Sequence, residues 1–530
     1  MHTNDQPKTA EVKVELPAAL REIQRLQTEN RILRQQLALE RYRQFAPKSE
    51  KTPREQEAGL FNETEATADP AVPEPAAQAP TRKADVPSHG RRKPRGPRTI
   101  DLSRVAHEQI IYTLPEEELV CPECSGHLHE MGEETRQEIK VIPAHIVLVK
   151  HVRKKYACRH CQEHAISTPV LIALMPTPAF PGSLASPSAV AHIIGQKFLE
   201  AMPLYRQEKA WARSGIELSR QTLANWVIKG ADWLQPIYDK MRGRLVQSEI
   251  VKADETPVQV LHEDGRKAQT KSYMWLYRSG RDGPPIVVFE YQCTRSGEHP
   301  KEFLKNFRGY LQTDGYSGYS SLPDVKSVGC WAHARRKFDE ALSVLSNAER
   351  KKGGTVAHVG LDYCNRLFAI ERDLHEATPE VRKSARLERS KPLLDEFHIW
   401  LMTRSGDVLP KSPIGTAVSY PLNQWERLVR YLEDGRLDID NNSSERAIKP
   451  FVVGRKNWMF ANTPDGAKAS QVLYSVIETA KENGLNPTAY LQYLLEQLPA
   501  MTVSPTSLDP LLPWSPSLPS SLRAPGGAPK

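Results

Sequence analysis

The stretch Glu249-Ile-Val-Lys-Ala-Asp254-Glu-Thr-Pro257 decides the fold, because a region with the hydrophobic pattern of β-strands begins here. Four more strands are predicted downstream, at 272–277, 286–291, 309–313 and 326–330. After residue 331 the pattern becomes helical, and it stays helical to about residue 433. We therefore expect a sheet of five strands followed by a helical region.

Three acidic residues stand where catalysis would need them. Asp254 and Asp314 end two of the predicted strands, and Glu445 follows the capping run Asp440-Asn-Asn-Ser-Ser. Carboxylates from separate elements that converge on two Mg²⁺ ions can catalyse phosphoryl transfer. Hard cations prefer oxygen ligands, so Asp and Glu suit this chemistry better than His or Cys. The alternative is that each Asp caps a turn and that Glu445 complements a helix dipole.

Length and composition predict several domains and at least one linker. The chain has 530 residues, with 72 Lys and Arg against 64 Asp and Glu, a net charge of +8. Pro (42) outnumbers Gly (29) and only 39% of residues are hydrophobic, so part of the chain is not packed core. The chain has neither an apolar run of about 18 residues nor a secretory signal. We expect a cytoplasmic protein that does not contact a membrane.

Four of the seven cysteines form two CxxC pairs, Cys121 with Cys124 and Cys158 with Cys161. Two-residue spacing lets both thiolates of a pair reach one ion, and four such ligands form a closed, structural zinc site. Two β segments, at 138–142 and 145–149, are expected to bring the pairs together. Buried thiols without metal are the alternative, and nearby histidines compete as ligands: His127, His129, His160 and His164.

The N-terminal region predicts a coiled coil followed by a tether. Apolar residues and Asn30 alternate at spacings of three and four over residues 16–40: Leu16, Ala19, Ile23, Leu26, Asn30, Leu33 and Leu37. Asn30 falls on an a position, which favours a parallel dimer in one register. The alternative is a solitary amphipathic helix that packs on its own chain. Residues 47–104 are rich in Pro and Ala and then in Arg and Lys, which predicts an extended tether able to contact phosphates.

A helical hairpin is predicted between residues 203 and 229. Its helices meet at the break Ser214-Gly215, and Ser219 caps the second helix. This arrangement matches the helix-turn-helix plan, in which the start of the second helix enters a major groove. That start carries Arg220, Gln221 and Asn225. Helical hairpins with Gly turns are also common in proteins that never touch DNA.

Six long motifs resemble, in the same order, those of transposases of the insertion sequence 66 family. They are Ala253-Asp254-Glu-Thr-Pro257, Leu311-Gln-Thr-Asp314-Gly-Tyr-Ser-Gly-Tyr319, Gly329-Cys-Trp-Ala-His333-Ala-Arg-Arg-Lys-Phe338, Asp440-Asn-Asn-Ser-Ser-Glu445-Arg-Ala-Ile-Lys-Pro450, Gly454-Arg-Lys-Asn-Trp458 and Glu478-Thr-Ala-Lys-Glu-Asn-Gly484. The resemblance also covers the coiled coil, the cysteine pairs and the helical hairpin. Lys449 stands where the family often has Arg, and both can pair with phosphate.

The resemblance implies that Asp254, Asp314 and Glu445 are the DDE triad of a ribonuclease H-like α/β catalytic domain with an all-α insertion. Such an enzyme uses two Mg²⁺ ions to hydrolyse one strand at each transposon end. The freed 3′ hydroxyl then attacks target DNA. The resemblance also implies small accessory proteins of the same element, and the coiled coil adds the expectation of a homo-oligomer.

The predicted organisation is therefore multidomain α+β. Its parts are a coiled coil (1–46), a flexible basic linker (47–104), a zinc ribbon (105–176), a helix-turn-helix domain (185–235), the catalytic domain in two parts (246–345 and 436–498), the helical insertion (346–435) and a C-terminal tail (499–530). The last thirty residues are rich in Pro and Ser, so we expect most of the tail to be disordered.

Basic residues near the acids are candidates for DNA contact, although exposed basic residues on a helix are often only solvated. They are Arg335, Arg336, Lys337, Arg446, Arg455 and Lys456. Cys330 and His333 form a CxxH pair, for which we expect a structural role rather than a second zinc. Two other functions compete with a transposase. One is a catalytically inactive, zipper-dimerised DNA-binding regulator, and the other is an Mg²⁺ nuclease that cuts DNA without joining it.

Overall fold

The computed structural model describes residues 12–45, 146–152, 154–157, 170–172, 178–500 and 505–524, except residues 282, 321 and 323. The chain divides into two units, one of residues 1–50 with 153–530 and one of residues 51–152. The four cysteines of the predicted zinc site and the segment predicted at 138–142 lie outside the described residues. Residues 146–149 form no strand, so the β prediction at 145–149 is wrong over those positions.

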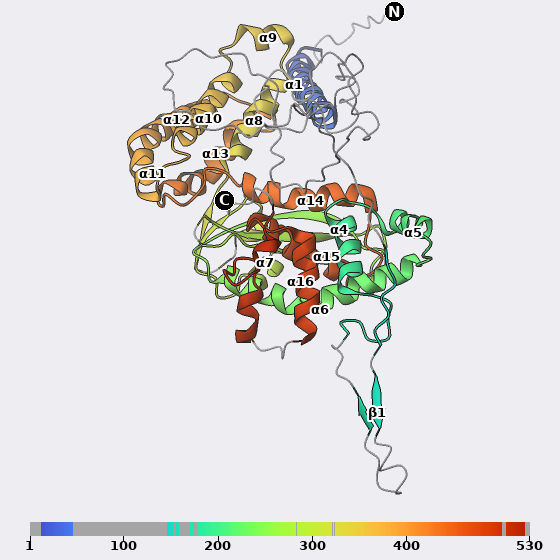
Figure 1. The fold of residues 1–530 in the computed structure, drawn as a ribbon. Helices are drawn as coiled ribbons and strands as arrows, with labels where there is room; N and C mark the ends of the chain where they lie inside the picture. Colours follow the sequence, from blue (N-terminus) through green and yellow to red (C-terminus); the bar gives the residue numbers. More distant parts are fainter. Residues whose placement is uncertain are drawn as a thin grey trace, which may run out of the picture. The chain divides into compact units, whose positions relative to one another are not determined.

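A five-stranded mixed sheet confirms the five strands predicted between residues 248 and 331 (Figure 1). The strands are β3 (Ile250–Gln259), β4 (Lys271–Ser279), β5 (Val287–Gln292), β6 (Gly309–Gln312) and β7 (Val325–Val328). Their order is β5-β4-β3-β6-β7, with β4 antiparallel to β3 and β5, and β6 parallel to β3 and β7. β3 pairs with β4 from Val251 to Gln259 but with β6 only at its first three residues. β3 is therefore longer than predicted.

Side chains of α15 (Pro464–Glu482) cover the outer edge of β5. Gln471, Ser475 and Thr479 accept hydrogen bonds of 2.8–3.0 Å from alternate backbone N–H groups of β5, those of Tyr291, Phe289 and Val287. The four-residue spacing on the helix matches the two-residue spacing on the strand. An edge strand otherwise presents unpaired N–H groups, so α15 completes the sheet on this side.

The predicted helix-turn-helix segment shares one hydrophobic core with the sheet. α5 (Leu204–Arg213) and α6 (Arg220–Val246) flank the predicted turn, and the Ser219 hydroxyl caps α6 as expected. α6 runs well past residue 229, and its second half buries Tyr238 and Met241 in the same cluster as the strands. α4 (Pro187–Phe198) and α16 (Pro487–Gln497) complete this core. Residues 185–235 are thus packed as part of the sheet domain.

The helices predicted after residue 331 form a second hydrophobic core. It is formed mainly by α8 (Trp331–Ser343), α10 (Val356–Asp373), α12 (Lys391–Ser405) and α13 (Pro413–Val429), with α9 (Asn347–Lys352) and α11 (Pro379–Ala385) between them. The rings of Tyr363 and Phe397 stack at 4.6 Å in this core. Fully buried Arg386 pairs with Glu371 and donates to the backbone carbonyls of Tyr431 and Leu437, which ties the insertion to the chain leading into α14 (Asn442–Trp458).

The remaining elements include one long helix and a small hairpin. α1 (Val12–Phe45) is a continuous helix over the predicted coiled coil, β1 (Lys155–Ala157) pairs antiparallel with β2 (Val170–Ile172), and α7 (Glu298–Phe303) precedes β6. None of the helices in the described ranges is long and apolar enough to cross a bilayer.

The C-terminal tail differs from the prediction over its described part, residues 505–524. Five leucines of this segment are buried in the sheet core: Leu508, Leu511, Leu512, Leu518 and Leu522. The Tyr490 hydroxyl of α16 donates to the Leu511 carbonyl at 2.6 Å. Pro and Ser content suggested disorder, but the leucines between them supply enough apolar surface to pack this segment.

Candidate active site

Three alternate residues of β3 face α14. Successive side chains of a strand point to opposite faces, so Lys252, Asp254 and Thr256 share one face. The Lys252 ammonium donates to the Ser443 hydroxyl in the first turn of α14 at 3.0 Å, and Arg455 near the helix end donates to the Thr256 hydroxyl at 3.2 Å. Asp254 lies between these two contacts along the strand. Its side chain therefore faces the helix that carries Glu445.

The segment that leads into α14 is fixed by hydrogen bonds to the sheet. The Gln312 side-chain amide donates to the Asp438 carbonyl at 2.7 Å, and the Asn441 side-chain amide donates to the Ala253 carbonyl at 2.9 Å. Both donors are buried. Because β3 and β6 hold this segment, they also determine where α14 begins and where Glu445 lies in its first turn.

Asp314 lies two residues beyond the end of β6, in the loop that leads to the short turn η2 (Ser317–Tyr319). Its carboxylate accepts a hydrogen bond from the Tyr316 backbone N–H at 2.9 Å, and its carbonyl accepts one from the Tyr420 hydroxyl at 3.0 Å. The strand-end position predicted for Asp314 is confirmed. The same prediction is wrong for Asp254, which lies in the middle of β3 opposite Leu276, just beyond its pairing with β6.

The three acids are close enough to influence one another. Burial, the negative charge of Glu255 and, to a smaller extent, the charges of Asp314 and Glu445 together raise the pKa of Asp254 to about 8. The structure thus brings the three acids predicted from sequence to one place. Such a cluster favours either a bound proton or a bound cation.

Glu445 faces two basic side chains of α8. The His333 ring nitrogen Nε2 lies 3.9 Å from its carboxylate, and the Arg336 guanidinium lies 3.7 Å from it. Burial lowers the pKa of His333 to about 4, so the ring is neutral at pH 7. Cys330 is fully buried, and its sulfur accepts the Asn441 backbone N–H at 3.2 Å. These contacts support the predicted structural role of the CxxH pair.

The donor set suits hard divalent cations, although it does not enclose one. Across the described ranges, no group of three His, Cys, Asp or Glu side chains surrounds a common ion position. Mg²⁺, however, keeps several water ligands and needs only one or two carboxylates. A cation bound between these partly buried carboxylates would reduce the repulsion between them. The acids therefore fit magnesium by chemistry and by charge.

The predicted DNA-contacting residues differ in their surroundings. Several are engaged within the protein: Arg220 with Glu208 at 3.1 Å, Arg335 with Asn365 at 2.8 Å, Lys337 with Glu340 at 3.7 Å, and Arg455 with Thr256. Gln221, Asn225, Arg446 and Lys456 are exposed. Arg336 lies beside Glu445. The structure thus divides the predicted set into residues held by the fold and residues that face solvent.

Sequence reasoning missed three charged residues around the site. Lys252 and Asp438 form a buried ion pair beside Asp254, and Glu255 is buried on the other face of β3. One signal was present in the sequence, because Lys252 stands between the apolar residues Val251 and Ala253. A charge at such a position requires a partner from elsewhere in the chain.

Comparison with known proteins gives three matches along this chain. The family described as Transposase IS66 family matches residues 182–469, the zinc-finger binding domain of transposase IS66 matches residues 118–162, and the IS66 C-terminal element matches residues 475–514. Two similar proteins are the uncharacterized proteins y4hP and y4jD of Sinorhizobium fredii (strain NBRC 101917 / NGR234). The first is 33% identical over 462 residues, 83% of this chain and 80% of its own length. The second is 31% identical over 413 residues, 75% of this chain and 78% of its own.

Proposed function

Because the chain belongs to the IS66 transposase family, we propose that it is a DDE transposase that cuts and joins the ends of its own insertion sequence. The observation that carries this proposal is the meeting of Asp254, Asp314 and Glu445, which come from a strand, a loop and a helix far apart in the sequence. The mixed sheet with α14 against β3 supports the ribonuclease H-like class implied by the sequence motifs.

In this proposal the three carboxylates hold Mg²⁺. Bound Mg²⁺ would help to activate the attacking oxygen and would offset charge on the leaving oxygen. The fold contributes by holding partly buried acids close together, and burial of Asp254 together with the neighbouring acids raises its pKa. Neutral His333 leaves the charge of Glu445 available for a cation, and Arg336 stands where it can reach a substrate phosphate.

The N-terminal modules are proposed to bind the element ends. The zinc-finger match supports a structural zinc, and we assign Cys121, Cys124, Cys158 and Cys161 as its ligands because all four fall within 118–162. Exposed Gln221 and Asn225 of α6 are assigned to base contacts. Arg220 is assigned a different role, because it is held by Glu208 and lies over the Tyr205 ring at 5.5 Å. It fixes α6 against α5.

The exposed face of α14 is proposed as a track for the DNA backbone. Arg446, Lys449, Val453 and Lys456 are exposed and recur at spacings of three and four, so they share one side of the helix. This side begins directly after Glu445. Basic side chains placed in this way hold phosphates without reading sequence. Arg455 points instead to Thr256 and is assigned to the support of β3.

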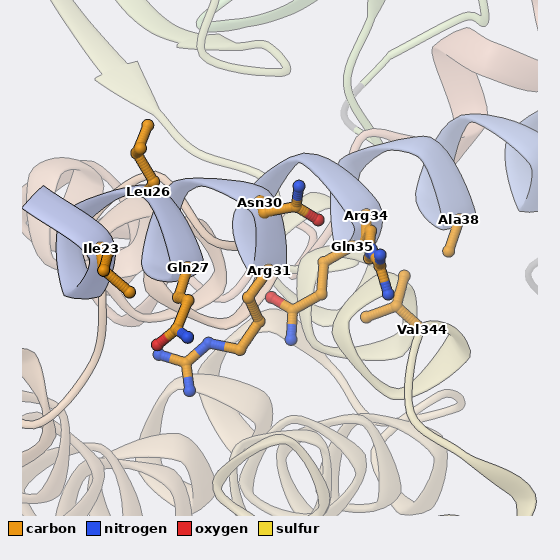
Figure 2. Close-up of a pocket in the computed structure, with 9 residues that line it drawn as sticks. All are labelled: Ile23, Leu26, Gln27, Asn30, Arg31, Arg34, Gln35, Ala38 and Val344. Atoms are coloured by element: carbon orange, nitrogen blue, oxygen red, sulfur yellow. The ribbon is translucent and has the colours of Figure 1, made fainter.

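Homo-oligomers are proposed to form through α1. Four residues of the predicted heptad stripe, Ile23, Leu26, Leu33 and Leu37, are 49–56% exposed. Figure 2 shows Ile23, Leu26 and Asn30 on α1 among residues that line a pocket. A second α1 packed on this stripe would bury apolar surface that one chain leaves in water. Accessory proteins of the same element are further proposed partners.

Strand cleavage and strand transfer test this function. Purified wild-type protein, incubated with Mg²⁺ and DNA carrying the terminal repeats that flank its gene, is expected to free 3′ ends and join them to target DNA. Asp314→Asn and Glu445→Gln should keep DNA binding and lose both reactions. Cleavage at the wild-type rate by both variants would exclude these residues as catalytic. Binding without cleavage by the wild type would favour the inactive regulator, and cleavage without joining would favour a nuclease.

A further inference from the structure

The loop that carries Asp314 is tied to the strand that carries Asp254 by side chains on the far face of β3. Glu255 follows Asp254 in the strand, so its side chain points to the opposite face. There its carboxylate accepts hydrogen bonds from the Tyr319 hydroxyl at 2.6 Å and from the Arg295 guanidinium Nε at 3.0 Å. The Glu255 side chain is only 3% exposed, so these partners replace its contact with water.

Tyr316 connects the loop that carries Asp314 to the loop that carries Arg295. Its backbone N–H donates to the Asp314 carboxylate at 2.9 Å. Its ring stacks on the Arg295 guanidinium at 3.8 Å, and its hydroxyl donates to the Arg295 carbonyl at 2.6 Å. One tyrosine therefore binds the catalytic carboxylate through its backbone and Arg295 through its side chain.

Close packing leaves this loop little freedom. The Trp275 ring lies 5.7 Å from the Tyr319 ring and 6.5 Å from the Tyr316 ring. A Cβ on Gly297 would lie 2.6 Å from the carbonyl oxygen of Gly318, too close for any other residue. Gly315 has a φ of +93°, which side chains with a Cβ rarely adopt. A Cβ on Gly318 would overlap the Tyr316 ring, so both glycines of the motif that follows Asp314 have a steric reason.

We propose that Arg295 and Glu255 are positioning residues that set the place of Asp314 relative to Asp254. This inference rests on the proposed function, because it concerns the same acids. Glu255 acts as an anchor rather than as a fourth metal ligand, because Tyr319 and Arg295 bind its two oxygens. A catalytic group displaced by about 1 Å can slow a reaction about 100-fold, so loss of the anchor slows cleavage without weakening DNA binding.

Single-turnover cleavage at saturating DNA tests the role of Arg295. Arg295→Met is expected to lower the rate about 10- to 100-fold, with an unchanged dissociation constant for DNA, and Arg295→Lys is expected to restore part of the rate. The matched control is Arg308→Met at another exposed arginine of the same domain, which should behave as wild type. If Arg295→Met instead weakens DNA binding, lowers its salt dependence and leaves the saturated rate unchanged, Arg295 is a phosphate contact and the proposal is wrong.

Hydrogen exchange gives a readout that does not depend on catalysis. Backbone amides of residues 314–319 should exchange faster in Arg295→Met than in wild type, while peptides of α14 should not change. Tyr319→Phe removes only the hydroxyl bound to Glu255, and it should also speed exchange of residues 314–319, by a smaller factor. If Arg295→Met does not fold, exchange in Tyr319→Phe tests the inference instead. Unchanged exchange in residues 314–319 would overturn the inference. If wild-type protein does not cleave DNA, the proposed function is wrong. Hydrogen exchange then still shows whether Glu255, through Arg295 and Tyr319, holds the loop of Asp314 in place.

Discussion

Two partly buried aspartates near the same lysine have opposite electrostatic surroundings. Burial alone would raise the pKa of Asp438, but Lys252 and Arg281 lower it to about 2. Asp254 lies two residues from Lys252 along β3, yet burial and three neighbouring acids raise its pKa to about 8. Asp438 therefore has two cationic partners in the fold, whereas the charged neighbours that act on Asp254 are acids.

The difference distinguishes a structural carboxylate from a functional one. A buried charge with well-placed partners holds elements together, here β3 and the segment before α14. A buried acid among acids costs stability, and perturbed groups of this kind cluster at functional sites. The Lys252–Asp438 ion pair holds the backbone that places Glu445, so it also helps to keep Glu445 near Asp254.

Breaking the Lys252–Asp438 ion pair should have the largest effect on stability. Asp438→Asn leaves the Lys252 ammonium buried with no counter-charge in its ion pair, and should lower the free energy of unfolding by about 3–5 kcal/mol. Urea denaturation of the full chain measures this loss. The control is Asp395→Asn, whose partner Lys391 is 54% exposed, with an expected loss below about 1 kcal/mol. Equal effects of the two substitutions would contradict the structural role of Asp438.

The cluster of Asp254, Asp314 and Glu445 should gain stability from a cation. With Mg²⁺ at about 100 times its dissociation constant, wild-type protein should be stabilised by about 2.7 kcal/mol. Thermal unfolding with and without Mg²⁺, at constant zinc, measures the gain. Asp254→Asn should lose most of it, whereas Asp395→Asn should keep it. A gain that survives Asp254→Asn would place the ion elsewhere.

Acid should weaken the Lys252–Asp438 ion pair within a defined range of pH. The pKa of Asp438 is lowered from 3.8 to about 2 in the folded chain. Its stabilisation is therefore complete above about pH 4 and is lost as the pH falls towards 2, a change of about 2 kcal/mol. Urea denaturation at pH 5, 4 and 3 should show a steeper decline for wild type than for Asp438→Asn. Parallel declines would mean that other groups control acid unfolding.

The strands and their order along the chain could be predicted because alternation is a local property of sequence. The length of β3 could not, since its extension to Gln259 depends on pairing with β4. The helix predicted to end at residue 229 continues as α6 to Val246. Gly230 lies inside it, where a Cβ would come 2.9 Å from a methyl group of Val190 in α4, so close packing explains the glycine.

The three acids could be singled out by their motifs, but their surroundings could not be predicted. Asp254, Asp314 and Glu445 each stand in a recognisable run of residues. The partner of Glu255 is Arg295, 40 residues away, and the partner of Lys252 is Asp438, 186 residues away. No local pattern indicates pairs of this kind, because the fold alone brings them together.

Cleavage by Asp254→Asn, with melting measured on the same preparation, tests the central claim most directly. The account predicts a folded protein that, without Mg²⁺, melts at or above the wild-type temperature, because the asparagine removes an acid that burial and neighbouring acids disfavour in its charged form. The same variant should no longer cleave DNA in Mg²⁺. Cleavage at the wild-type rate by this variant would contradict the claim that Asp254, Asp314 and Glu445 form the catalytic centre.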